Sequence, residues 1–168
     1  MTTPEPTRTA GDFMETDVET VRPETPLPEI IEHLLHRHVS NVPVVEEHDG
    51  KPSLVGFISE ADCMEHLANQ LFYGNPAPAL TAEMIMKRHP VCVATDANIF
   101  TLASIFIHHQ LRHLPVVEEE RLLGIVSRRD VLEELDKYCR DIARRQDQEH
   151  RPPDLRDVIS HRFIARGR

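Results

Sequence analysis

Features that mark an enzyme are scarce in this sequence. Its 168 residues include six glycines and no tryptophan. There is no Gly-rich phosphate loop, no dinucleotide-binding fingerprint and no Gly-x-Ser-x-Gly nucleophile motif. We therefore expect no catalytic activity from this chain.

Cysteine is rare, and long apolar runs are absent. Cys63, Cys92 and Cys139 are far apart and form no Cys-x-x-Cys pair, which is typical of reduced thiols in a reducing compartment. The eleven histidines show no zinc-site spacing, so no metal is expected. No run of eighteen apolar residues exists, and the N-terminus lacks a basic region followed by an apolar one. These observations favour a cytoplasmic protein without a membrane segment.

Positive charge is scarce in most of the chain. Residues 1–136 hold 10 Lys and Arg against 23 Asp and Glu, whereas residues 137–168 hold 9 against 5. The acidic part disfavours nucleic-acid binding. A weaker alternative is contact between the basic tail and a nucleic acid or membrane surface, through Arg140, Arg144, Arg145, Arg151, Arg156, Arg162, Arg166 and Arg168.

The sequence does contain a tandem repeat. His113-Leu114-Pro115-Val116-Val117 is followed by an apolar run that ends in Ser127-x-x-Asp130. Asn41-Val42-Pro43-Val44-Val45 is followed in the same way, after a loop four residues longer, by a run that ends in Ser59-x-x-Asp62. Upstream, Met14 aligns with Met86 and His36 with His108. Two apolar runs joined by acidic turn residues predict a hairpin of buried strands in each repeat.

These motifs resemble those of the cystathionine-beta-synthase (CBS) domain, whose pattern includes x-x-Pro-Val and Gly-h-h-Ser-x-x-Asp (h, hydrophobic). The resemblance implies an α/β fold of two tandem β-α-β-β-α units, packed as a pseudo-two-fold pair, with a C-terminal helical extension. The expected organisation is a disordered lead at 1–11, a first unit at 12–74, a linker at 75–81, a second unit at 82–136 and the extension at 137–168.

Apolar spacing predicts the individual elements. A first strand is expected at 18–21, and short turns at 12–14 and 83–86. Helices are expected up to His38 and, in the second unit, over the apolar residues 99–107. Others should run from Asp62 to Tyr73, and from Ser127 or Arg128 past Cys139 towards Ala143, where Arg151-Pro152-Pro153 ends the last helix. A short extra helix is expected at 155–164.

The Ser-x-x-Asp motifs have two compatible interpretations. Locally, each is a helix cap in which Ser and Asp hydrogen-bond across the first turn. A phosphate at the same helix N-terminus would meet free amides and a positive dipole. The resemblance assigns Ser59 and Ser127 to the phosphate, and Asp62 and Asp130 to the ribose.

The residues inside the two motifs differ. Arg128 and Arg129 lie between Ser127 and Asp130, whereas Glu60 and Ala61 lie between Ser59 and Asp62. Guanidinium groups form charge-assisted bonds with phosphate. We therefore expect the second site to bind anions more strongly and the first to be weaker or to select a less charged ligand. The alternative for both arginines is a solvated first helical turn.

The resemblance also suggests where an adenine would lie. It places the base between the x-x-Pro-Val strand and the start of the unit, against main-chain groups near Val42 and Leu114. Asn41 and His113 would flank it, with apolar contact from Val21 and Val93. Each of these residues also has an ordinary role in a core or a turn.

The function implied by the resemblance is a regulatory module that binds AMP, ADP, ATP or S-adenosylmethionine. We expect an adenine nucleotide as ligand, no catalytic cofactor, a homodimer formed through helix faces, and an unknown protein target. Ligand binding would be relayed by a conformational or dimer change. The main alternative is a ligand-free interaction scaffold in which Ser-x-x-Asp is only a cap.

Overall fold

The computed structural model describes residues 8–73 and 79–149. The chain divides into two units, residues 1–132 and 133–168. The helices are α1 (Ala10–Phe13), α2 (Leu27–Arg37), α3 (Glu60–Tyr73), α4 (Ala82–Ile85), α5 (Ile99–His109) and α6 (Arg128–Glu149). The strands are β1 (Asn41–His48), β2 (Lys51–Ser59), β3 (Lys87–Arg88), β4 (His113–Glu118) and β5 (Arg121–Ser127).

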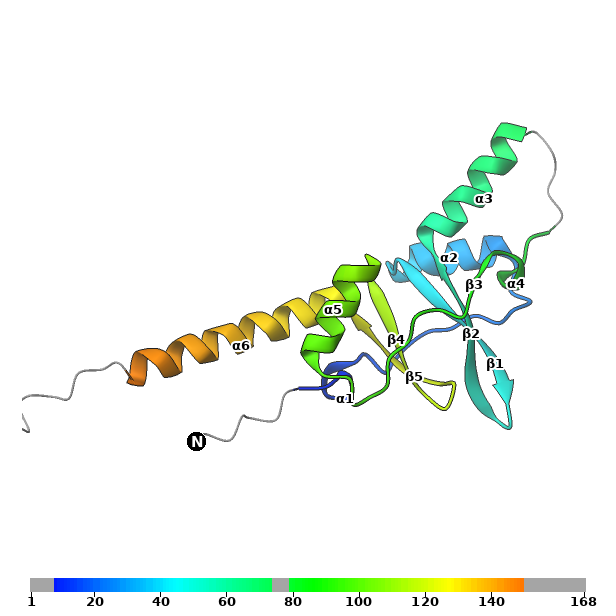
Figure 1. The fold of residues 1–168 in the computed structure, drawn as a ribbon. Helices are drawn as coiled ribbons and strands as arrows, with labels where there is room; N and C mark the ends of the chain where they lie inside the picture. The colour runs from blue at the N-terminus through cyan, green and yellow to red at the C-terminus, as the bar shows by residue number, and fades with distance from the viewer. Residues whose placement is uncertain (1–7, 74–78, 150–168) are drawn as a thin grey trace, which may run out of the picture. The chain divides into compact units, whose positions relative to one another are not determined.

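Two antiparallel hairpins, β1–β2 and β4–β5, form the centre of the first unit (Figure 1). They correspond to the two repeats, and both have a bulge at the same place, after Val44 and after Val116. Their strands are ordered β1-β2-β5-β4, with β3 paired to β2. Pro43 and Pro115 therefore lie on outer strands of this order, where a missing amide N–H is tolerated. The predicted α/β fold of two repeats is confirmed.

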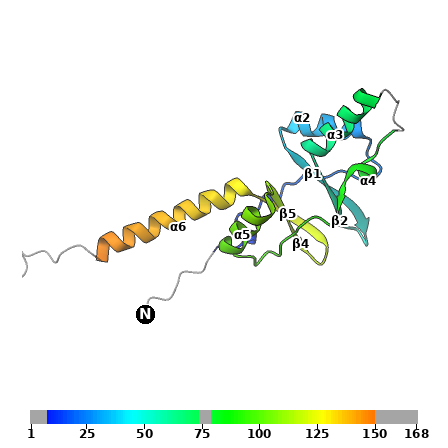
Figure 2. The same ribbon diagram turned by 45° about the horizontal axis from the view of Figure 1, so that its top comes forward.

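The two hairpins join where β2 meets β5. Ser53 pairs with Arg121, and the Leu54 N–H donates to the Glu120 carbonyl at 2.9 Å. Figure 2 shows α2 and α3 beside the first hairpin and α5 beside the second. The apolar faces predicted for these helices are buried only in part, since Ile30, Leu34, Leu102 and Phe106 are buried whereas Leu35, Met64, Leu71 and Ile107 are exposed. Each hairpin has its own layer of helices.

The segments that precede each repeat are exchanged between the hairpins. We call residues 8–19 crossing segment 1 and residues 80–91 crossing segment 2. In crossing segment 1, the Ala10 N–H donates to the Ala97 carbonyl, and Glu15 exchanges two 2.9 Å backbone bonds with Ile125 of β5. Crossing segment 2 supplies α4, and β3, which pairs with Gly56 and Phe57 of β2. Each segment thus packs against the hairpin of the other repeat.

The predicted strand at 18–21 is wrong. Val21 forms only an isolated parallel bridge with Val44, as Val93 does with Val116. The chain is crossing from one hairpin to the other over these residues, so no neighbouring strand runs beside it for long enough to form a ladder. Val21 is buried at a single point of contact, and Val18 is only half-buried.

The core follows the exchange. The first hairpin packs its buried side chains against α2 and also against α4 of crossing segment 2. This hydrophobic core cluster consists of Val21, Leu27, Ile30, Leu34, Val42, Val44, Ile58, Cys63, Ala82, Ile85 and Met86. Buried equivalents around the second hairpin include Ala10, Val93, Leu102, Phe106, Leu114, Val116 and Val126. Neither repeat completes its core from its own sequence.

Helix boundaries agree closely with the sequence pattern. α2 ends at a left-handed residue, His38 (φ 54°), and α5 ends in the same way at Gln110 (φ 52°). α6 runs to Glu149, in agreement with the helix end predicted at Arg151-Pro152-Pro153. The predicted helix at 155–164 lies outside the described residues. None of the helices described here is long and apolar enough to span a bilayer.

Glycine is required where the crossing segments lie on the hairpins. A Cβ on Gly56 would lie 2.2 Å from the Met86 sulfur, and one on Gly124 would lie 2.6 Å from the Glu15 carbonyl oxygen. Met14, the equivalent of Met86, lies against Gly124 in the same way. The glycine of each Gly-h-h-Ser motif therefore serves close backbone approach.

We predict that Gly124→Ala destabilises the fold by about 2 kcal/mol, because the added methyl group overpacks a contact with fixed backbone. The measurement is urea-induced unfolding. Thr101→Ala, on the exposed side of α5, is the control and should change the free energy of unfolding by less than about 0.5 kcal/mol. Equal stability of Gly124→Ala and wild type would contradict the close packing of crossing segment 1.

Candidate ligand-binding pockets

Each Ser-x-x-Asp motif lies in the wall of a cavity. The Asp62 pocket has a volume of about 850 Å³ and contains Ser59 and Asp62. The Asp130 pocket has a volume of about 500 Å³ and contains Ser127 and Asp130. Both volumes lie in the range of cavities that bind small molecules. Both cavities combine residues from the two repeats.

Asp62 and Ser59 form a reciprocal cap at the start of α3. The Ser59 N–H and hydroxyl donate to Asp62 Oδ2 at 2.8 and 2.6 Å, and the Asp62 N–H donates to Ser59 Oγ at 3.3 Å. The other carboxylate oxygen, Oδ1, lies 2.9 Å from Lys87 Nζ of crossing segment 2. The predicted cap is therefore present. In addition, Asp62 forms an ion pair with Lys87, which comes from the other repeat.

Asp62 is ionised despite being only 8% exposed. Burial acts to raise its pKa, but the hydrogen bonds from Ser59 and Lys87 outweigh this and hold the pKa below its ordinary value. The carboxylate is consequently available as an acceptor at neutral pH, fixed in orientation by the helix start.

Basic side chains surround the mouth of the Asp62 pocket. Lys87, Arg88 and His89 come from crossing segment 2, and Arg112 comes from the turn between α5 and β4. Arg88 also pairs with Glu83 at 2.9 Å. The pocket lining thus combines three cations, Lys87, Arg88 and Arg112, with the carboxylates of Asp62 and Glu60.

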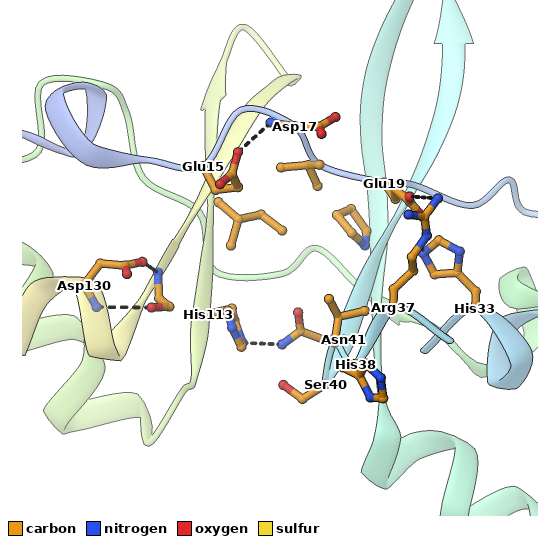
Figure 3. Close-up of a pocket in the computed structure, with 15 residues that line it drawn as sticks. Glu15, Asp17, Glu19, His33, Arg37, His38, Ser40, Asn41, His113 and Asp130 are labelled. Carbon is orange, nitrogen blue, oxygen red and sulfur yellow. Dashed lines mark hydrogen bonds and ion pairs between the residues drawn. The ribbon is translucent and has the colours of Figure 1, made fainter. Parts of the chain in front are cut away.

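The Asp130 pocket has the opposite character (Figure 3). The Ser127 N–H donates to Asp130 Oδ2 at 2.9 Å, and the Asp130 N–H donates to Ser127 Oγ at 3.1 Å, as in the other cap. Its wall, however, is formed by Glu15, Asp17 and Glu19 of crossing segment 1. With Asp130, they give this cavity four carboxylates, against the single arginine Arg37. Unlike that of the Asp62 pocket, this lining disfavours a phosphate by like-charge repulsion.

Arginine 37 supplies positive charge to the Asp130 pocket, but it is paired. Glu19 forms ion pairs with Arg37 and with His33, the latter at 3.2 Å. Both partners come from α2 and face the crossing segment in Figure 3. These interactions hold Glu19 at the pocket wall. Glu15 and Asp17 line the same pocket as Asp130.

The lining charges of the two pockets differ from what the motif residues alone suggest. Arg128 and Arg129 are exposed on the first turn of α6 and line neither pocket. At the first motif, Glu60 and Ala61 do line the pocket, together with Lys87, Arg88 and Arg112, whereas the Asp130 pocket holds Arg37 and four carboxylates. The relative anion affinity of the two sites stays a prediction. Contact between Arg128 or Arg129 and a ligand stays a prediction.

Asn41 and His113 connect the two pockets. They occupy equivalent positions in the repeats, their side chains are 2.6 Å apart between Nδ2 and Nδ1, and both line both cavities. Burial lowers the pKa of His113. The nearby charge of Asp130 acts to raise this pKa, and that of Arg112 acts to lower it further. A neutral ring keeps Nδ1 as an acceptor for the Asn41 amide. The predicted flanking residues thus lie at the shared wall.

The other predicted adenine contacts lie deeper. The side chains of Val42 and Leu114 are fully buried, and those of Val21 and Val93 are nearly so. None of the four lines either pocket. Their roles towards a ligand stay predictions. Sequence reasoning missed Lys87, Arg88, Glu15 and Asp17, although aligning Glu15 with Lys87 and Asp17 with His89 shows the reversal of charge.

The remaining titratable groups do not form a metal site. Among residues 8–73 and 79–149, no three His, Cys, Asp or Glu side chains meet in a cluster suited to a metal ion. Burial, helped by Asp62, raises the pKa of Cys63, and burial also raises that of Cys92. Both thiols are therefore protonated at neutral pH.

We predict that Asp62→Asn lowers stability most at neutral pH. The folded pKa of Asp62 lies below its ordinary value of 3.8, so its contribution is present above that value and is lost as pH falls through the folded pKa. Urea unfolding at about pH 7 and about pH 3 should show a larger deficit at the higher pH. Asp96→Asn, an exposed carboxylate, is the control. A deficit that is the same at both pH values would argue against the charged network.

Comparison with known proteins identifies the repeat. The CBS domain family matches residues 10–69 and 82–137, which together make up more than half of the chain. The chain is 27% identical over 150 residues to the CBS domain-containing protein CBSX1 of Arabidopsis thaliana. That alignment covers 74% of this chain and 62% of the relative. The chain is 25% identical to hypoxic response protein 1 of Mycobacterium tuberculosis, and that alignment covers 78% of this chain and 87% of the relative. It spans only 39% of an uncharacterised relative from Thermofilum pendens.

Solved structures show the same fold. The crystal structure of CBSX2 in complex with AMP matches with a TM-score of 0.65 and 26% identity, covering 78% of this chain and 98% of the other. A protein from Methanocaldococcus jannaschii, described as a putative archaeal homologue of g-AMPK, matches with a TM-score of 0.68 and 26% identity, covering 78% and 49%. With two family matches, two equivalent hairpins and two Ser-x-x-Asp caps, this chain belongs to the CBS domain family as a tandem pair.

Proposed function

We propose that this chain is a non-enzymatic regulatory module that binds an adenine nucleotide in the Asp62 pocket. The observation that carries the proposal is the placement of Lys87, Arg88 and Arg112 around an ionised Asp62 at the start of a helix. The complex of the related CBSX2 with AMP supports the ligand class. The pocket supplies complementary groups for both parts of such a ligand, phosphate and ribose.

Binding would redistribute the contacts of Lys87. In the free pocket its ammonium group neutralises Asp62. A ribose hydroxyl can donate to the carboxylate in its place, and Lys87 can then turn to the phosphate together with Arg88. The Ser59 hydroxyl, which donates to Asp62 Oδ2 in the free pocket, would turn to the phosphate. Asp62 would keep its orientation because the Ser59 N–H still donates to Oδ2.

The Asp130 pocket would select a different adenosyl ligand. Glu15, Asp17 and Asp130 disfavour phosphate there by like-charge repulsion. An adenosyl compound without phosphates, and with a neutral or cationic side chain, suits this lining. S-adenosylmethionine, with its sulfonium charge, is the candidate among the expected ligands.

A ligand would act on the relation between the repeats. Each pocket combines a helix start from one repeat with a crossing segment from the other, and Asn41 bonds to His113 between them. A bound nucleotide favours the arrangement of hairpins that it fits, and a partner protein or dimer contact can respond. The regulated target and the cytoplasmic location stay predictions. A ligand-free scaffold is the alternative.

We predict that AMP raises the thermal unfolding midpoint of the wild-type chain. A nucleotide at 100 times its dissociation constant stabilises the native state by about 2.7 kcal/mol. Lys87→Gln should weaken AMP binding roughly tenfold, through loss of one charge-assisted contact. Arg37→Gln, in the Asp130 pocket, is the matched control and should leave AMP binding unchanged.

Parallel titrations with ADP, ATP and S-adenosylmethionine identify the preferred ligand, and Asp62→Ala is compared with Asp130→Ala. If AMP no longer raised the unfolding midpoint of Asp130→Ala but still raised that of Asp62→Ala, the nucleotide would bind in the Asp130 pocket instead. No shift with any of the four compounds would favour the scaffold.

We also propose a homodimer formed through the helix faces of the first unit. Exposed apolar side chains occupy equivalent positions in the two repeats: Leu35 and Ile107 are 65% and 74% exposed, and Met64 and Leu132 are 64% and 66% exposed. Leu71 on α3 extends this surface at 84% exposure. Repetition of the same apolar positions around the pseudo-two-fold pair gives a self-complementary face.

We predict that Met64→Glu combined with Leu132→Glu converts the dimer to a monomer, since each charge would be buried without a partner in the interface. Light scattering coupled to size-exclusion chromatography measures the mass. Glu29→Gln, on an exposed position of α2, is the control. A double variant that keeps the dimeric mass would place the interface elsewhere.

A further inference from the structure

The second half of α6 is an addition to the family fold. The family match ends at residue 137, whereas α6 continues as a helix to Glu149. The residues from 133 onwards also form the separate second unit of the chain. Neither the pockets nor the apolar face of the first unit uses this part of the helix.

An apolar seam follows this part of α6. Leu135, Tyr138 and Ile142 are spaced by three and four residues, so they share one side of the helix. Tyr138 is 41% and Ile142 40% exposed, and Leu135 is half-buried. This is the spacing with which two helices pack their side chains together.

Charge along α6 is arranged in two blocks. Residues 130–136 hold four acidic side chains and no basic one, whereas residues 137–146 hold four basic side chains and one acidic one. Within one helix, this order suits the macrodipole and allows the pairs Lys137–Glu134 and Arg140–Asp136. Between two copies of the helix, it also determines direction. Parallel copies would place like charges side by side, and antiparallel copies place the acidic block beside the basic one.

We propose that α6 pairs antiparallel with α6 of a second copy of this chain. Centring the pair between Tyr138 and Cys139 places Leu135 opposite Ile142 of the second copy, so each seam covers the other. The same register places Glu133 opposite Arg144 and brings Asp136 within one residue of Arg140, whereas Asp136 lies opposite Asp141 and Lys137 opposite Arg140. The apolar spacing and the order of the two charge blocks, which are independent features of the sequence, both favour this arrangement.

Oligomeric mass alone does not test this pairing, because copies joined through the helix faces of the first unit are dimeric whether or not α6 pairs. Disulfide formation between chosen residues of α6 tests the pairing directly. Leu135→Cys and Ile142→Cys are made separately in a full-length Cys139→Ser background, with a purification tag on one of them. The two proteins are mixed and oxidised, and the products are separated by mass on a gel.

The mixed disulfide between Leu135→Cys and Ile142→Cys should exceed either self-disulfide by roughly tenfold. In the antiparallel pair, two copies of residue 135 are separated along the axis by about 10 Å, beyond the roughly 7 Å that a disulfide spans. Salt at about 1 M should reduce the mixed product, since it screens the charge blocks. Ala143→Cys, off the seam, mixed with Leu135→Cys is the control and should give little product.

Self-disulfides in both variants would show a parallel pair and overturn the proposal. Absence of any cross-link would also overturn it. The variants lie on exposed or half-exposed positions outside the first unit. Their folding is checked by the unchanged urea midpoint of that unit.

Discussion

The structure depends on the exchange of backbone between its two repeats. Crossing segment 1 pairs Glu15 with Ile125, and crossing segment 2 pairs β3 with β2. The absence of a side chain at Gly56 and Gly124 lets Met86 and Met14 approach the strands closely. The buried methionine and the backbone bonds then hold each segment in place. The cores, the pocket walls and the lining charges all follow from this arrangement.

Because of the exchange, the two pockets have similar caps but linings of different charge. The two caps are almost superposable in their bonds, since both Ser-x-x-Asp motifs close on the first turn of a helix. The walls come from elsewhere in the chain and carry opposite charge, with Lys87 in one pocket and Glu15 at the equivalent position in the other. Similar sites can therefore discriminate between ligands of different charge without any change in the frame that supports them.

The sequence was sufficient for much of the fold and for less of the site. The short apolar runs around x-x-Pro-Val and the spacing of Ile30 and Leu34 depend on local burial, so the hairpins and helices could be predicted. The strand expected at 18–21 failed because its partners are contributed one bridge at a time by distant residues. Contact between Arg128 or Arg129 and a ligand stays a prediction for a related reason. Both are adjacent to Asp130 in sequence, but the acidic residues that line its pocket, Glu15, Asp17 and Glu19, lie more than a hundred positions earlier.

The incomplete core of each repeat has a consequence for how such a chain arises. A protein with one repeat would bury its methionine and build its pocket wall only by taking the crossing segment of another copy. The tandem chain is thus equivalent to a symmetric dimer whose halves have been joined by a peptide. Once they are joined, the halves no longer need identical sequences, and a substitution in one crossing segment alters one pocket alone. Duplication followed by fusion turns a symmetric pair of sites into two sites that can evolve separately.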